Sequence, residues 1–242
     1  MVSQLPKSEA TEVFYPDSDD QPMASNTEQY RWIVTIKENL DWLLPDAFVA
    51  GDLFWYPIEG RSDISVAPDV MVALGRPKGK RLSYKQWQEE GTAPQVIFEI
   101  LSPSNTRKEM EQKLLFFERH GVEEYYLYDT EDHSLSGFLR GEFGLEHIPN
   151  MADWVSPLLK IRFDMSSDEL ALYHPDGSPF LSYQAVIQRA ELAEEQAELA
   201  EQRAESAEQQ AELAEQRAES AEQQAARLAE KLRELGIAPE EA

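Results

Sequence analysis

The chain has 242 residues, which is enough for one domain with a hydrophobic core and an additional segment. It contains no cysteine, which excludes disulfides, thiolate metal sites and a cysteine nucleophile and is consistent with a cytoplasmic protein. The formal net charge of −24 argues against tight non-specific binding to nucleic acid, because Lys and Arg contacts to phosphates supply most of that affinity.

The N-terminal residues 1–23 are polar and rich in turn-forming residues. They lack a basic start followed by an apolar block, so the sequence predicts a disordered arm and no secretory signal. No apolar run in the chain approaches the roughly 20 residues that span a bilayer, so we expect no membrane segment.

Residues 24–182 have the mixed composition of a globular domain. The domain opens with a predicted amphipathic helix at residues 27–44, where Ile33, Ile36 and Leu40 recur at helical spacing. Apolar segments after it predict strands at 47–57 (interrupted by a turn), 67–74 and 95–102. The polar, basic segment 75–94 predicts a loop with a helical turn.

A second helix is predicted at residues 106–121. Thr106 and Glu109 have the spacing of a capping box, and Gly121 suits the position just after the last helical residue. A strand at 122–129 and an antiparallel meander up to about residue 164 follow. Strands on both sides of a helix indicate an α/β fold, with a mixed sheet flanked by helices.

One carboxylate interrupts the apolar strand "QVIFEIL" at residues 95–101. Strand side chains alternate between faces, so Glu99 shares a face with Ile97 and Leu101. Burying this carboxylate without a partner would cost several kcal/mol. We therefore expect a cation to compensate its charge.

Two residues are placed to join Glu99. Lys113 borders the apolar stripe of the second helix, which includes Met110 and Phe117, and the short connection brings that helix close to the strand. Asp69 lies at the start of the preceding strand. Two acids on neighbouring strands could hold Mg²⁺ or Mn²⁺, and such an ion assists phosphodiester hydrolysis. A purely structural Glu99–Lys113 ion pair is the alternative.

Four motifs carry a family resemblance. They are the PD of "APDVMVAL", the segment "EILSPS" from Glu99, the helix with Lys113, and "GVEEYY" at 121–126. Together they resemble the Uma-two family of endonucleases, within the PD-(D/E)xK restriction-endonuclease-like superfamily, over residues 24–182. The resemblance implies a restriction-endonuclease-like fold and Mg²⁺-dependent nuclease chemistry.

The resemblance also implies roles for individual residues. Asp69 and Glu99 would be metal ligands, with the Ile100 carbonyl as a third. Asp52 matches a family-like position at a strand end and would add a further carboxylate, although an ordinary turn residue is an equal alternative.

The sequence departs from the superfamily pattern at one position. Leu101 occupies the place of the lysine in E-x-K, and leucine cannot act on a phosphate. Lys113 would then be the substitute, and the enzymatic interpretation depends on whether it reaches the site. Gln29 on the first helix could line the site, but we expect it at the surface.

Other signals are weaker. The four histidines form no metal-ligand pair, and the chain contains no P-loop, Rossmann or nucleophile-elbow motif. The basic residues at 75–85 would suit contact with a phosphate backbone or simply a solvated loop.

The C-terminal segment 183–236 predicts one long helix with a seven-residue repeat. With Tyr183 at position a, alanine occupies most a and d positions and Leu228 and Leu235 end the d row. In a parallel pair, Arg203 at position g would meet Glu208 of the partner at position e. The repeat therefore predicts a parallel homodimeric coiled coil, with a lone solvated helix as the alternative. Residues 237–242 predict a disordered tail.

These features favour a metal-dependent endonuclease whose expected substrate is nucleic acid, with DNA preferred, and which dimerises through its tail. Two alternatives stay open. One is a non-catalytic module of the same fold that binds nucleic acid or protein. The other is a scaffold whose main activity is the coiled coil.

Overall fold

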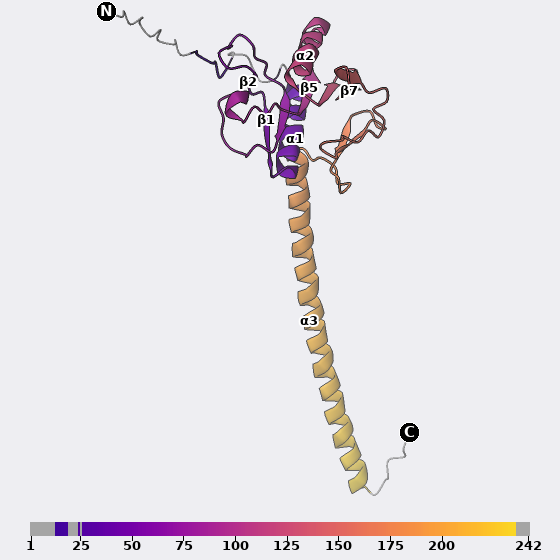
Figure 1. Cartoon of the computed structure of the whole chain (residues 1–242). Coiled ribbons are helices and arrows are strands. Elements are labelled where there is room, and N and C mark those ends of the chain that lie inside the picture. Colours follow the sequence, from indigo (N-terminus) through magenta and orange to yellow (C-terminus); the bar gives the residue numbers. More distant parts are fainter. Residues whose placement is uncertain (1–12, 19–23, 25, 236–242) are drawn as a thin grey trace, which may run out of the picture. The chain divides into compact units, whose positions relative to one another are not determined.

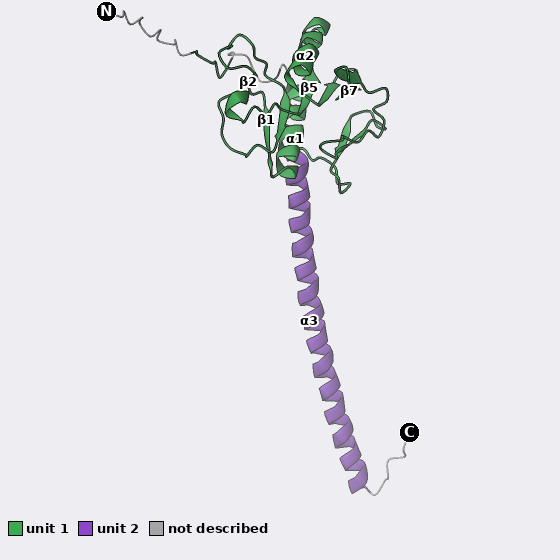
Figure 2. Ribbon diagram, in the orientation of Figure 1, with its two compact units in different colours: residues 1–183 green, residues 184–242 purple. Residues whose placement is uncertain are grey.

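The computed structural model describes residues 13–18, 24 and 26–235. The chain divides into two compact units, residues 1–183 and 184–242 (Figure 2). Most of the predicted N-terminal arm (1–12 and 19–23) and the predicted C-terminal tail (237–242) lie outside the described residues. No helix in the described ranges has both the length and the apolar character that a membrane crossing requires.

The first unit is built on a six-stranded mixed sheet (Figure 1). Its strands, in spatial order, are β1 (Ala47–Gly51), β3 (Val70–Leu74), β5 (Val96–Leu101), β6 (Glu124–Asp129), β7 (Ser134–Arg140) and β8 (Leu145–His147). Among neighbouring strands of this sheet, only β5 and β6 run parallel to each other. Helix α2 (Arg107–His120) connects them, because parallel neighbours require a crossover connection. The predicted α/β class with a mixed sheet is confirmed.

Each face of the sheet is covered. Val96, Phe98 and Ile100 of β5 belong to a core that also contains residues of helix α1 (Thr27–Leu43). The alternate residue Ile97 belongs to a second core together with Phe117 of α2. Because both faces are buried, β5 is apolar at almost every position, and Glu99 is the exception.

The helix ends follow local sequence signals. The capping box of α2 forms between Thr106 and Glu109, and Gly121 adopts the left-handed conformation (φ 97°) that ends the helix. Asn26 caps α1, its side chain accepting a hydrogen bond from the Gln29 amide at 2.8 Å. These caps fix which side chains α1 and α2 direct toward the sheet.

Two parts of the fold differ from the prediction. The predicted meander stops at β8, and β9 (Arg162–Asp164) instead pairs with β10 (Ala171–Tyr173) in a separate two-stranded sheet. The basic insertion contains β4 (Tyr84–Lys85), which pairs in parallel with β2 (Trp55–Tyr56), and the 3₁₀ turn η1 (Gln86–Gln88). The fully buried Tyr84 and Trp55 side chains anchor that pairing, which a polar composition did not indicate.

Part of the predicted arm contacts the domain. The Tyr15 hydroxyl accepts a hydrogen bond from the Gly60 amide at 2.6 Å, and the Tyr56 hydroxyl donates one to the Pro16 carbonyl at 2.7 Å. In the second unit, α3 (Tyr183–Glu234) is one continuous helix of 52 residues with no buried side chain.

Candidate active site

The register of the sheet sets Asp69 beside Glu99. Val70 of β3 lies opposite Phe98 of β5 in an antiparallel pair, so the next position places Asp69 across from Glu99. Both residues are buried, with exposed fractions of 9% and 2%. Glu99 lies on the face that α2 covers, because Ile97, two residues earlier, packs with Phe117 of that helix.

Lys113 reaches Glu99 from α2. Its Nζ atom lies 2.7 Å from Glu99 Oε2, and its side chain is 19% exposed. The helix directs Lys113 toward the sheet because Met110 and Phe117, three residues before and four after it, are buried. The structure therefore places the Lys113 ammonium beside the Glu99 carboxylate. Lys113 needs this contact in order to replace the lysine that is missing at Leu101.

The backbone of Ile100 links the site to α1. Its amide donates a hydrogen bond to Asp69 Oδ2 at 2.6 Å, and its carbonyl accepts one from Gln29 Nε2 at 2.8 Å. The Gln29 side chain also hydrogen-bonds to the Asp69 carboxylate. Gln29 is only 6% exposed, so our expectation of a surface residue was wrong. The Asn26 cap, three residues earlier, was the available signal that Gln29 lies in the first helical turn.

Asp52 lies near this backbone without completing a cluster of acids. It has a left-handed conformation (φ 48°), and its amide donates to the carbonyls of Pro68 and Asp69 at 3.1 and 3.3 Å. Its side chain is exposed. In the part of the chain that the structure describes, no three or more His, Cys, Asp or Glu side chains group closely enough to hold a metal ion.

Burial governs the protonation of the site. It raises the pKa of Glu99 to about 8, while Lys113 opposes the rise and Asp69 adds to it. Burial also raises the pKa of Asp69, against the effects of Lys113 and the Ile100 amide. Burial alone would lower the pKa of Lys113, but the Glu99 and Asp69 carboxylates outweigh it and the pKa is raised. Burial thus favours the protonated form of Glu99 and Lys113 favours the ionised form, and the effect of burial on the pKa is the larger one.

One carboxylate oxygen in the site has an unused lone pair. Glu99 Oε1 is buried and has no hydrogen-bond partner among the described residues, although buried carboxylate oxygens normally have one. Mg²⁺ is typically held by one or two carboxylates, with water in the remaining positions. Glu99, Asp69 and the Ile100 carbonyl thus supply oxygen donors of the type that this ion prefers.

Thermal unfolding of the metal-free protein tests the protonation of Glu99. Folding raises the pKa of this residue from 4.5 to about 8, so between those pH values the folded protein binds more protons than the unfolded chain. The contribution of Glu99 to stability should therefore fall as the pH rises from about 5 to about 8, whereas His120 and His174, whose pKa values burial lowers, contribute in the opposite direction. Over this range the melting temperature of Glu99→Gln should therefore rise relative to that of wild type, and parallel pH profiles of the two proteins would contradict the assignment.

The basic insertion is less available to a phosphate backbone than its sequence suggests. Arg81 pairs with Glu89 at 2.6 Å and Arg76 pairs with Glu90 at 2.9 Å, within the same segment. Lys78 pairs with Asp41 of α1 at 2.8 Å. These three cations form ion pairs within the insertion and with α1. They are therefore less free to contact phosphates, which favours the interpretation of the segment as a solvated loop.

Comparisons with known proteins come from a family model and a solved structure. The model of the Uma2 family, described as "Putative restriction endonuclease", matches residues 21–166. A crystal structure described as "a putative nuclease belonging to DUF820", from Anabaena variabilis, is 17% identical over 55% of this chain and 73% of that one, with a TM-score of 0.42. No curated protein matches the chain. Since the family model spans more than half of the sequence, this chain belongs to the Uma2 family of restriction-endonuclease-like proteins.

Proposed function

We propose that this protein is a divalent-metal-dependent endonuclease that hydrolyses phosphodiester bonds of nucleic acid, with DNA as the expected substrate. The observation that carries the proposal is the convergence of Glu99, Lys113 and Asp69 from two strands and a helix. A buried acid with a raised pKa and a specific charged partner is typical of functional sites. Membership of a nuclease family supports the same conclusion.

Asp69 and Glu99 would hold Mg²⁺ or Mn²⁺, with the Ile100 carbonyl as a further oxygen donor. When bound, such an ion lowers the pKa of a coordinated water and stabilises negative charge on a phosphate. The Ile100 amide and Gln29 fix the Asp69 carboxylate and the Ile100 carbonyl in place before any ion arrives. Asp52 is proposed as an additional carboxylate on the exposed side.

Lys113 has two proposed tasks. Its Nζ atom orients the Glu99 carboxylate through Oε2. Its ammonium also adds a positive charge that can stabilise the phosphate as it gains negative charge during hydrolysis. Leu101, in the position of the usual lysine, is partly buried and offers no such group.

Cleavage assays test the proposal directly. The purified full-length chain should nick supercoiled plasmid DNA in Mg²⁺ or Mn²⁺, and a chelator should stop the reaction. Single-stranded DNA and structured RNA, assayed in parallel, identify the substrate class. If the folded protein cleaves none of these with any divalent ion, the non-catalytic binding module becomes the better interpretation.

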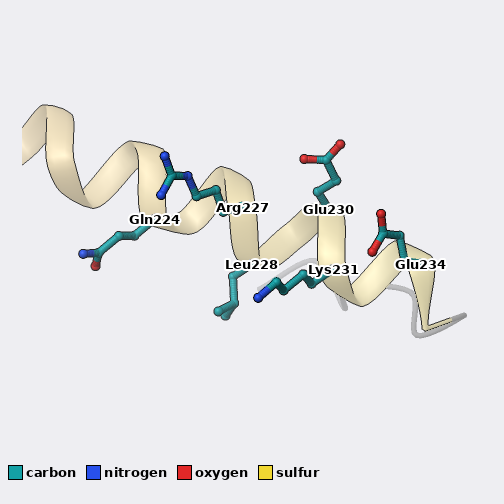
Figure 3. Close-up of a pocket in the computed structure, with 6 residues that line it drawn as sticks. All are labelled: Gln224, Arg227, Leu228, Glu230, Lys231 and Glu234. Atoms are coloured by element: carbon teal, nitrogen blue, oxygen red, sulfur yellow. The ribbon is translucent and has the colours of Figure 1, made fainter.

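We also propose that residues 183–236 form a parallel homodimeric coiled coil in the cytoplasm. All side chains of α3 are solvent-exposed or partly so, including Leu228 at 66%, so no described residue covers the apolar seam. Figure 3 shows Leu228 and Lys231 on one side of the last turns and Glu230 on the other. That arrangement agrees with positions d, g and f of the repeat.

Matched charge insertions test the dimer. Lysine at two d positions, Ala207→Lys and Ala214→Lys, should give a monomer by light scattering, because both charges would lie in the seam. Gln209→Lys and Gln216→Lys add the same charge at outward-facing f positions and should leave a dimer. A wild-type protein that is monomeric at high micromolar concentration would contradict the coiled coil.

A further inference from the structure

A second buried polar atom without a partner lies on the same face of the sheet as Glu99. Like Glu99 Oε1, the Tyr125 hydroxyl has no hydrogen-bond partner among the described residues. Tyr125 is 1% exposed, and a buried hydroxyl without a partner normally destabilises the folded state. Among the described residues one more such atom is found, His174 Nδ1, and it follows β10 outside the six-stranded sheet, so only Glu99 Oε1 and the Tyr125 hydroxyl share this face and call for a common explanation.

The strand register places Tyr125 next to the site. Tyr125 of β6 lies opposite Ile97 of β5 in the parallel pair, two residues before the position of Glu99. Both side chains face α2, because the Tyr125 ring packs against Phe117 with 5.1 Å between ring centroids. Phe117 follows Lys113 by one turn of α2, so the Tyr125 ring lies under the part of the helix that also supplies the ammonium.

Electrostatic coupling agrees with this placement. Burial raises the pKa of the Tyr125 hydroxyl, and the carboxylates of Glu99 and Asp69 raise it further. Tyr125 therefore stays protonated over the whole accessible pH range and can act only as a neutral hydrogen-bond donor toward an acid.

We propose that Tyr125 is a positioning residue of the site, whose hydroxyl donates a hydrogen bond to Glu99 Oε1, directly after a small side-chain rotation or through one buried water. The bond forms in the metal-bound protein. With Lys113 on Oε2 and Tyr125 on Oε1, both carboxylate oxygens then have a fixed orientation. This inference rests on the proposed metal-binding function.

Two other buried tyrosines show the hydrogen bonding of a purely structural hydroxyl. Tyr126, the next residue, donates from its hydroxyl to Glu124 Oε2 at 2.9 Å and accepts from Trp154 Nε1 at 3.0 Å. Tyr84, in the same core as Tyr125, donates to the Thr92 carbonyl at 2.8 Å. These hydroxyls have their partners already, whereas the Tyr125 hydroxyl has none in the part of the chain that the structure describes.

Calorimetric titration with Mn²⁺ tests the proposal, using full-length wild type, Tyr125→Phe and the matched control Tyr84→Phe. Removing a group that orients a metal ligand should weaken Mn²⁺ binding about 10- to 100-fold in Tyr125→Phe. Tyr84→Phe should bind Mn²⁺ like wild type and should lose thermal stability, because it removes a satisfied hydrogen bond. Tyr125→Phe should lose no stability without metal.

The outcomes separate this inference from the proposed function. Normal Mn²⁺ affinity in Tyr125→Phe, with wild type binding Mn²⁺, overturns the role of Tyr125 and leaves the metal site standing. Absence of Mn²⁺ binding in wild type overturns both. Equal weakening in both phenylalanine variants would also contradict the proposal, because it would reflect a general effect on the core.

Discussion

Replacing Glu99 with glutamine should abolish uptake of Mg²⁺ and Mn²⁺ and, with it, cleavage of nucleic acid. Glutamine keeps the shape of the side chain and an oxygen that can accept a hydrogen bond from Lys113, but it removes the charge that a divalent ion requires. We expect Mn²⁺ binding below detection by calorimetry and a cleavage rate at least about 100-fold lower.

The same substitution should not harm the fold. Glu99 is nearly fully buried, and ionising it above pH 8 costs stability that an uncharged amide does not lose. The free energy of unfolding of Glu99→Gln should therefore equal or exceed that of wild type at pH 8. Glu111→Gln, at an exposed carboxylate on α2, is the matched control and should change neither property. Metal uptake that survives in Glu99→Gln would contradict the site.

If Glu99→Gln is more stable than wild type but does not function, then Glu99 is present for function and not for stability. The strand that carries it is otherwise apolar, and every principle of packing favours an apolar residue there. The neighbours Asp69 and Lys113 reduce the cost of Glu99 without removing it, since Oε1 still lacks a partner within the described chain.

The parts of the site that local patterns determine were predictable from the sequence. Strand alternation placed Glu99 on a buried face, and helix phase with a short connection placed Lys113 above it. The capping box fixed that phase to within one residue. For the same reason the predicted bounds of α1 and α2 agree with the structure to within one residue at each end.

The parts that depend on packing between distant segments were not predictable. Gln29 contacts a carbonyl 71 residues away, and its own surroundings in the sequence resemble those of an exposed first turn. Likewise, the periodicity of the sequence predicts that the segment of β9 continues the meander, whereas in the structure β9 pairs with β10. Packing in the tertiary fold determines which of the two pairings forms. Tyr125 was predictable as a strand residue, but the missing partner of its hydroxyl is a property of the packed core.

Replacing Lys113 with methionine should separate its two proposed tasks. Methionine retains the apolar stem that packs beside Met110 and Phe117 but leaves both Glu99 oxygens without a partner. Without Lys113, which lowers the pKa of Glu99, that pKa should rise above its wild-type value, so Glu99 stays protonated near pH 8 and the free energy of unfolding falls little there. At higher pH, where the carboxylate ionises without a partner, the fall should grow toward about 3–5 kcal/mol. Lys108→Met, an exposed position on the same helix, should be close to neutral.

Metal binding should suffer less than cleavage in Lys113→Met. The loss of the orienting hydrogen bond to Glu99 Oε2 weakens Mn²⁺ binding, but removal of a positive charge beside the site offsets it, so the affinity should change by less than about 10-fold. Cleavage should nevertheless fall by about 100-fold or more, because the charge that stabilises the phosphate is gone. Combining Lys113→Met with Glu99→Gln should restore stability, since no buried carboxylate is then left unpaired. Full cleavage by Lys113→Met would show that the lysine only compensates Glu99 and that another group replaces the missing E-x-K lysine.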